Sequence, residues 1–362
     1  MKDHTLNYVK ILTPYPDQAD NLAMRATGAD YPSLCMESMI NYGTEKNYDL
    51  ILFDFVMNNT DGFPLLLKRL RERYPSAVIV YVHIWSLVHL IVEEGTGRRP
   101  NEIPRREWNK RDWVWKDGDT FQSSAPKLCG REVCGLDEMS KLVADVGGHV
   151  YFMPRPSHVT PRNVIDMGWF GPDLHHLTEI GHQVLADGIL QLLSPLKSEL
   201  FSVKPFGTFG FGDQCYNWFE TGKVDLEIKG GTLVNMLAQF SENPEDKKFV
   251  LEIDPDKGGE IYFKSKFIVD APLGLGYMSQ SEPRNYPIVE ITANYNQPPI
   301  LIDPNKNRSF RGHVHITAFS HVGWAKPGDN VIHITPKEKT KYPLRIIGIY
   351  ICGICAESGD LW

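Results

Sequence analysis

Residues 48–83 decide the fold of the first half of the chain. The runs Tyr48-Asp-Leu-Ile-Leu-Phe-Asp-Phe-Val56 and Ala77-Val-Ile-Val-Tyr-Val-His83 are apolar and have the length of strands. Between them, Phe63–Tyr74 has apolar residues at helical spacing. A strand, a helix and a second strand in this order form a unit with parallel strands. Because both runs are apolar throughout, we expect helices on both faces of the sheet.

The same alternation continues on both sides of this unit. We predict one further strand of this sheet at His149–Phe152 and a short strand at Tyr8–Leu12. The predicted helices are Ser33–Tyr42, Leu136–Val146 and Thr178–Leu193. Residues 1–200 are therefore predicted to form an α/β domain with a parallel sheet. Ligands bind such sheets beyond the carboxyl ends of the strands.

After about residue 200 the pattern changes to short strands separated by Gly, Pro, Asn and Asp. The predicted strands are Val224–Lys229, Lys248–Ile253, Glu260–Val269, Pro287–Ala293, His313–Phe319, Val331–Ile334 and Arg345–Ile351. Seven short strands with almost no helix indicate an all-β sandwich, which we place at residues 213–358. The linker between the two domains is expected within Pro195–Gly212.

Composition excludes several classes of protein. With 42% hydrophobic and 23% charged residues the chain is globular rather than disordered, and its net charge of −7 disfavours nucleic-acid binding. We find no apolar run long enough to span a bilayer and no signal peptide at the N-terminus. The basic, Trp-containing stretch Arg98–Lys116 is predicted to be a solvated surface loop, with a substrate-gating loop as the alternative.

Six cysteines are few for 362 residues. The single Cys352-x-x-Cys355 is weak evidence for zinc, and one or two disulfides in an oxidising compartment, for example Cys129–Cys134, are favoured instead. His313 and His315 alternate on one predicted strand, and we interpret them as structural rather than metal-binding. We expect no metal and no organic cofactor.

The chemistry is concentrated in Asp173-Leu-His-His176, where an extended segment meets a predicted helix. Alone, such a spacing is more often a helix N-cap beside a surface histidine. Two other elements favour catalysis. Asn58 follows a predicted strand, where its amide can donate to an oxyanion, and Gly28 lies in a loop whose backbone N–H can approach a substrate.

The order of glycine loop, strand-end Asn and Asp-x-x-His resembles the SGNH hydrolases, also called GDSL-type esterases. The resemblance covers about residues 1–195 and implies a flavodoxin-like three-layer α/β/α fold with a Ser-His-Asp triad. It implies Asp173 and His176 as catalytic residues and Gly28 and Asn58 as oxyanion-hole donors. The residue after the asparagine, usually Asp in the family, is Asn59 here. A β-sandwich follows the hydrolase domain in some SGNH-like proteins, where a glycan-directed role is plausible.

The family's first block, which carries Gly-Asp-Ser, is missing before Gly28. An inactive relative would be expected to keep the interior first strand and lose only the serine, because losing the strand leaves its neighbours unpaired. We therefore favour an N-terminally incomplete hydrolase of acyl or acetyl esters, on small molecules or glycans, whose nucleophile is unknown. The alternative is an inactive glycan-binding or structural protein. A secretory location is favoured.

Overall fold

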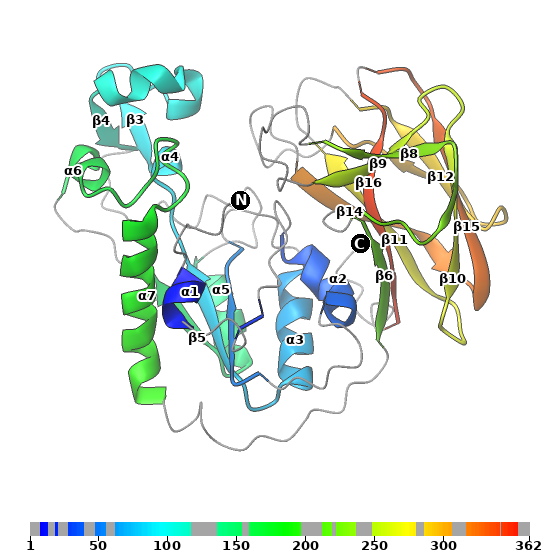
Figure 1. The fold of residues 1–362 in the computed structure, drawn as a ribbon, viewed down its shortest axis with the longest axis horizontal. Helices are drawn as coiled ribbons and strands as arrows, with labels where there is room; N and C mark the ends of the chain where they lie inside the picture. The colour runs from blue at the N-terminus through cyan, green and yellow to red at the C-terminus, as the bar shows by residue number, and fades with distance from the viewer. Residues whose placement is uncertain are drawn as a thin grey trace.

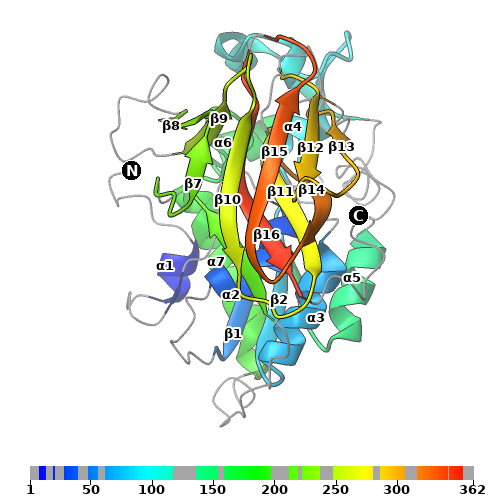
Figure 2. The same cartoon turned by 90° about the vertical axis from the view of Figure 1, so that its right-hand side faces the viewer.

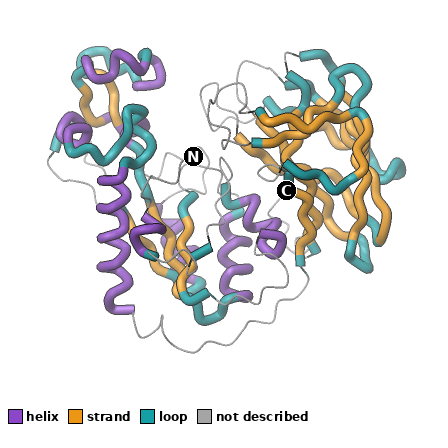
Figure 3. Tube along the Cα trace, in the orientation of Figure 1, coloured by secondary structure: helices purple, strands orange, loops and turns teal. Residues whose placement is uncertain are grey.

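The computed structural model describes residues 8–13, 19–20, 28–39, 48–55, 62–116, 136–153, 159–196, 212–218, 222–236, 248–279, 286–305, 316–340 and 342–353. Among these residues, every helix precedes residue 197, and the part after residue 211 consists of strands and loops (Figures 1 and 3). The predicted fold class, an α/β domain followed by an all-β sandwich, is confirmed.

The α/β part is built on a three-stranded parallel sheet. Strands β1 (Leu50–Phe53), β2 (Val78–His83) and β5 (His149–Phe152) lie in the order β1-β2-β5. All six residues of β2 are buried, which explains its unbroken apolar sequence. Ile79 and Tyr81 belong to one core cluster, while Val78 and Val80 belong to another on the opposite face. The sheet is thus covered on both sides.

Two groups of helices supply these covers. The first comprises α2 (Asp30–Met39), α3 (Phe63–Arg73) and α5 (Leu136–Asp145), and the second comprises α1 (Tyr8–Leu12) and α7 (Glu179–Leu193). A short helix, α6 (Pro161–Asp166), precedes α7. None of the helices in the described part of the chain is long and apolar enough to cross a bilayer.

The prediction of a strand at Tyr8–Leu12 is wrong, because this segment is helix α1. A strand would place Lys10 on the same face as Tyr8 and Leu12, whereas a helix brings Tyr8 and Leu12 together one turn apart. Both side chains pack against the core cluster that contains α7. The Thr13 hydroxyl donates to the Val9 carbonyl at 2.7 Å and closes the helix.

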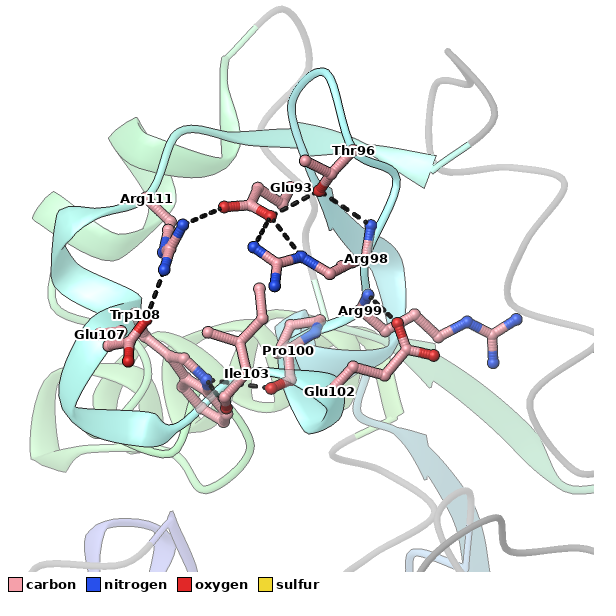
Figure 4. Close-up of polar contacts among 10 residues, drawn as sticks. All are labelled: Glu93, Thr96, Arg98, Arg99, Pro100, Glu102, Ile103, Glu107, Trp108 and Arg111. Atoms are coloured by element: carbon pink, nitrogen blue, oxygen red, sulfur yellow. Dashed lines mark hydrogen bonds and ion pairs between the residues drawn. The ribbon is translucent and has the colours of Figure 1, made fainter.

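Residues 91–116, which we call the cap, are folded, so the prediction of a solvated loop at Arg98–Lys116 is wrong (Figure 4). It consists of β3 (Ile91–Glu93), two 3₁₀ turns (Pro100–Glu102 and Arg105–Lys110) and β4 (Trp113–Trp115), with β3 antiparallel to β4. Trp108 and Trp113 are each only 5% exposed. The Trp108 indole donates to the Pro100 and Ile103 carbonyls, at 3.0 and 2.9 Å.

Charged side chains complete the cap. The Glu93 carboxylate lies 2.7 Å from both Arg98 Nη2 and Arg111 Nη1 (Figure 4). Arg111 also pairs with Glu107. A hydrogen bond from Thr96, together with the two arginines, lowers the pKa of Glu93 to about 2 although burial opposes the shift. The arginines that made this stretch resemble a solvated loop therefore stabilise its folded form.

The all-β part contains two antiparallel sheets. The strands in one sheet run in the order β13-β12-β15-β10-β7, and those in the other run β14-β11-β16-β9-β8, with β6 paired to β16. Their bounds are β6 Asp213–Asn217, β7 Glu227–Lys229, β8 Gly231–Asn235, β9 Phe249–Ile253, β10 Gly259–Ser265, β11 Ala271–Ser279, β12 Val289–Ala293, β13 Ile300–Ile302, β14 Ile316–Ala325, β15 Gly328–Pro336 and β16 Arg345–Cys352.

The two sheets differ in what covers their outer faces. In the five-stranded sheet, buried residues alternate with more exposed ones, as in β12, where Val289 and Ile291 are buried and Glu290 is not. By contrast, all nine residues of β11 in the second sheet are buried. Met278, Ile347 and Tyr350 of this sheet form one core cluster with Tyr31 and Leu34 of α2. The second sheet is therefore packed between the first sheet and helix α2.

Polar and covalent contacts reinforce this junction. A disulfide joins Cys35 of α2 to Cys215 of β6, and the pairing was not predicted from the sequence. Arg69 of α3 forms an ion pair of 2.5 Å with Asp213 of β6, and both side chains are fully buried. Asp213 also accepts hydrogen bonds from the backbone and hydroxyl of Ser38, at 3.3 and 3.2 Å. The α/β part and the sandwich thus share one continuous interior.

Candidate active site

The Asp-x-x-His element lies in the turn 171–176, between helices α6 and α7. Thr178 caps α7, and its hydroxyl accepts a hydrogen bond from the Gly181 backbone at 3.2 Å. A β-carbon at Gly181 would lie 2.3 Å from the Trp169 carbonyl, so glycine is required for this approach. The helix therefore begins at Glu179, three residues after His176, and fixes the end of the turn.

The predicted pair is formed. His176 Nδ1 lies 2.6 Å from Asp173 Oδ2, and Asp173 Oδ1 accepts the backbone N–H groups of His175 and His176, each at 3.0 Å. Burial of the Asp173 carboxyl acts to raise its pKa, but these hydrogen bonds outweigh it and lower the pKa to about 2. Asp173 is therefore a carboxylate at neutral pH.

The imidazole of His176 is open to solvent. Its side chain is 78% exposed, whereas that of Asp173 is 22% exposed. Because the carboxylate binds Nδ1, it holds the proton there and leaves Nε2 as the basic nitrogen. A histidine in this state can take a proton from a hydroxyl group and return it to a leaving group.

Backbone hydrogen bonds hold the turn in a strained shape. Gly171 donates to the His176 carbonyl at 2.8 Å, and Leu174 donates to Gly171 at 2.9 Å. Leu174 has φ +54°, in the left-handed region that a non-glycine residue rarely adopts, and its side chain is buried. Such conformations persist only where surrounding contacts impose them. The packing of Leu174 therefore sets the direction of both histidines.

The turn also forms hydrogen bonds with the segment that follows the central strand, β2. Ser86 follows β2 and precedes the short helix α4 (Leu87–Leu90). Ser86 Oγ lies 2.8 Å from His175 Nδ1, and the Val88 backbone donates to the Leu174 carbonyl at 2.9 Å. Sequence reasoning missed these contacts. The only signal was a serine and a helix start directly after a strand.

Ser86 does not complete a triad in this structure. Its side chain is buried, with 1% of the residue exposed, and its hydroxyl faces His175 rather than His176. His182, on helix α7, stacks on Tyr8 at 6.1 Å between ring centroids. Burial lowers the pKa of His182. Its role is therefore in packing α1 against α7.

Gly28 is buried immediately before α2, and Asn58 lies outside the described residues. The structure nevertheless describes what borders the Asn58 segment. The Gly62 backbone, at the start of α3, donates to Asp30 Oδ1 at 2.6 Å, so the start of α2 lies beside the end of that segment. The segment that ends at Gly62 follows β1, and Ser86 follows the parallel strand β2, so both come after carboxyl ends at the same edge of the sheet.

Most of the other positions singled out in the sequence lie outside the described part of the chain. The described residues contain no group of three His, Cys, Asp or Glu side chains that could hold a metal ion. His313, His315, Cys129, Cys134 and Cys355 lie outside the described residues. Cys352 is disulfide-bonded, which disfavours its use as a metal ligand.

No protein-family model and no curated protein matches the chain. Among solved structures, it is similar to a two-domain esterase active on acetylated mannans, with 10% identity and a TM-score of 0.47 over 92% of this chain and 80% of that one. Carbohydrate-binding modules of family 35 are similar to 39% of the chain. The Clostridium thermocellum module is 13% identical over 97% of its length, with a TM-score of 0.27, and the Cellvibrio japonicus Abf62 module is 9% identical over 94% of its length, with a TM-score of 0.27. At such low scores these likenesses concern the general arrangement, and the sheets of this chain establish its fold.

Proposed function

We propose that this chain carries the base and the orienting acid of an SGNH-type hydrolase that cleaves acyl or acetyl esters on carbohydrate. The observation that carries the proposal is the Asp173–His176 pair, with its 2.6 Å contact and a solvent-facing imidazole, at the carboxyl edge of a parallel sheet. The nucleophile is a serine whose position is not assigned.

In the proposed reaction His176 Nε2 takes the proton of the serine hydroxyl as its oxygen attacks the ester carbonyl. The tetrahedral intermediate then collapses, and the imidazolium gives its proton to the departing alcohol. Water releases the acyl group from the serine by the same two steps. Asp173 fixes the proton on Nδ1 and stabilises the imidazolium, without itself becoming protonated.

Gly28 and Asn58 are the proposed donors to the oxyanion. The backbone N–H of Gly28 and the side-chain amide of Asn58 are neutral donors of the type that stabilises a tetrahedral oxyanion. The hydrogen bond from Gly62 to Asp30 supports this assignment, since it brings the two segments that contain these donors together.

One observation favours a second candidate, a non-catalytic glycan-binding protein. The 362 residues contain no Gly-Asp-Ser, the block that carries the serine in the family that the chain resembles. The 362-residue chain is accordingly expected to hydrolyse p-nitrophenyl acetate at background rate. Robust turnover by this chain that is lost in His176→Ala would show that the serine lies within it.

The deciding experiment uses the complete gene product, expressed in its own host and assayed for acetate release from acetylated polysaccharide. We expect His176→Ala to lower kcat/KM by about 10³- to 10⁴-fold, and a fluorophosphonate probe to label one serine. His149→Ala, on β5, is the matched control and should keep its activity. A gene product that neither releases acetate nor reacts with the probe would exclude the serine esterase and leave the second candidate.

A further inference from the structure

The outer face of the five-stranded sheet carries a connected group of charged and aromatic side chains. In this sheet, Ile261 and Phe263 of β10 point into the core, so Glu260 and Tyr262 point outwards. Glu260 pairs across the strands with His333 of β15 on one side and Lys229 of β7 on the other. Figure 2 looks onto this face, with β7, β10, β15 and β12 in front.

Five residues form what we call the sheet-face cluster: Lys229, Glu260, Tyr262, Tyr295 and His333. The Glu260 carboxylate is its centre. One oxygen lies 3.2 Å from His333 Nδ1, and the other accepts the Tyr262 hydroxyl at 2.5 Å and lies 3.9 Å from Lys229 Nζ. The Lys229 ammonium lies over the Tyr262 ring, 4.4 Å from its centroid. The Glu260 carboxylate is therefore held in place from three sides.

Tyr295 displays its ring beside this carboxylate. It is 68% exposed and has φ +52°, directly after Asn294 with φ +53°. Asparagine tolerates this region, but a tyrosine there is strained, and such strain is often found where a ligand is held. Asn294 accepts from the Val331 backbone at 3.0 Å and donates to Asn330 at 2.8 Å, which fixes the turn. The ring of Tyr295 is thus positioned before any ligand arrives.

One face of the Tyr295 ring is supported and the rest is open. Its centroid lies 3.6 Å from that of the His333 imidazole, and its hydroxyl lies 3.5 Å from Glu260. His333 Nε2 is buried and has no hydrogen-bond partner in the part of the chain that the structure describes. Leaving a buried polar atom unpaired has a cost that an ordinary sheet surface avoids.

We propose that the sheet-face cluster binds a neutral pyranose residue of a glycan chain. An exposed ring offers a flat surface to the C–H face of a sugar. The adjoining carboxylate accepts, and the Lys229 ammonium donates, hydrogen bonds to neighbouring hydroxyl groups. Hydrogen bonding from Tyr262, with the charges of His333 and Lys229, lowers the pKa of Glu260, so this acceptor is ionised at neutral pH.

The charges of the cluster select a neutral sugar over an acidic one. Glu227 lies 3.6 Å from Lys229, so two carboxylates, those of Glu227 and Glu260, share one ammonium. Because two carboxylates share this one ammonium, a further carboxylate on a ligand would meet repulsion here, which disfavours a uronic acid. The choice of a glycan as ligand rests on the proposed function. The location of the binding site and its preference for a neutral sugar rest on the contacts of the cluster.

Native affinity gels containing soluble glucomannan, arabinoxylan, mixed-linkage β-glucan or polygalacturonate test the proposal on the 362-residue chain. At least one neutral polysaccharide should retard the chain, and polygalacturonate should not. Tyr295→Asn removes the ring but keeps a residue that tolerates the left-handed backbone, so it should weaken retardation at least tenfold without unfolding. Glu260→Gln should weaken it about threefold to tenfold, since a charged acceptor is replaced by a neutral one.

Leu301→Ala is the matched control, because Leu301 lies on β13 of the same sheet and is 62% exposed but lies outside the cluster. It should leave retardation unchanged. No retardation by any neutral polysaccharide, retardation by polygalacturonate alone, or full retardation of Tyr295→Asn would each overturn the proposal. If neutral polysaccharides still retard Tyr295→Asn, the sheet-face cluster is not the binding site, and the proposed esterase function is unaffected. If Tyr295→Asn loses binding while the gene product has no esterase activity, the proposed function alone fails.

Discussion

At the scale of single residues, Asp173 combines a chemical and a structural role. Its two oxygens accept three hydrogen bonds from the turn that it begins. Because the pKa of Asp173 in the folded protein, about 2, lies below its ordinary value of 3.8, this carboxylate stabilises the fold above about pH 4. That contribution is lost as the pH falls towards 2.

We expect Asp173→Asn to remove this dependence. At pH 7 the free energy of unfolding of the variant should be about 1 kcal/mol lower than that of the wild type. This is less than the pKa shift of Asp173 alone would give, because the pair is partly solvated. Near pH 2 the two proteins should be equally stable. Urea denaturation at the two pH values measures the difference, and an equal loss at both would show that the carboxylate charge is not involved.

The sequence predicted this pair because both partners lie within one short motif. It did not predict the contact of Ser86 with His175, which joins residues 89 positions apart. Nor did it indicate the left-handed backbone of Leu174, since leucine has no preference for that region. Contacts within a motif follow from spacing, whereas those between loops depend on the packing of the whole sheet.

At the scale of elements, strand β11 shows why glycine occurs inside a buried strand. Gly274 lies opposite Tyr350 of β16, and a β-carbon on Gly274 would lie 1.7 Å from the Tyr350 ring. The tyrosine thus occupies the space that a side chain on β11 would need. The sequence alone does not explain this glycine, because its reason lies in the side chain of the neighbouring strand.

Gly274→Ala is therefore expected to lower the free energy of unfolding by about 3 kcal/mol, since Tyr350 is fully buried and has little room to move. In a Tyr350→Leu background, Gly274→Ala should cost less free energy of unfolding than it does in the wild type. A thermodynamic cycle of these two variants, measured by chemical denaturation, tests the contact. Additive losses would mean that the two residues do not compete for the same space.

The cap shows how charge misled the sequence analysis. Seven basic residues within Arg98–Lys116 indicated a solvated segment, yet Arg98 and Arg111 converge on the single carboxylate of Glu93 (Figure 4). We expect Glu93→Gln to speed tryptic cleavage at Arg98 and Arg99 severalfold, because it removes the negative charge that holds Arg98 and Arg111 together. Glu94→Gln, at an exposed neighbouring position, should leave the cleavage rate unchanged. Equal rates in both variants would contradict this role of Glu93.

At the scale of the whole molecule, the junction between the α/β part and the sandwich is the least predictable feature. Its ion pair joins residues 144 positions apart, and its disulfide joins residues 180 positions apart. The two fold classes were predictable because each follows from local periodicity. The packing of the two parts against each other depends on single residues, Arg69 and Asp213. No local sequence pattern indicates that these two side chains are buried.

Removing one partner of the buried pair should therefore be costly. We expect Arg69→Ala to lower the free energy of unfolding by about 3–5 kcal/mol, because Asp213 would remain buried with an uncompensated charge. Lys68→Ala removes a neighbouring cation whose side chain is 66% exposed, and it should cost less than 0.5 kcal/mol. Similar losses in the two variants, measured by denaturant titration, would show that the junction does not depend on this pair.

The same junction limits how the gene can be divided or recombined. A breakpoint between residues 196 and 212 would give one fragment Cys35 and Arg69 and the other Cys215 and Asp213. Each fragment would then have to keep an apolar surface, a thiol and a charge in water. A foreign sandwich grafted onto this α/β part would therefore need to supply both a cysteine and a carboxylate at matching positions.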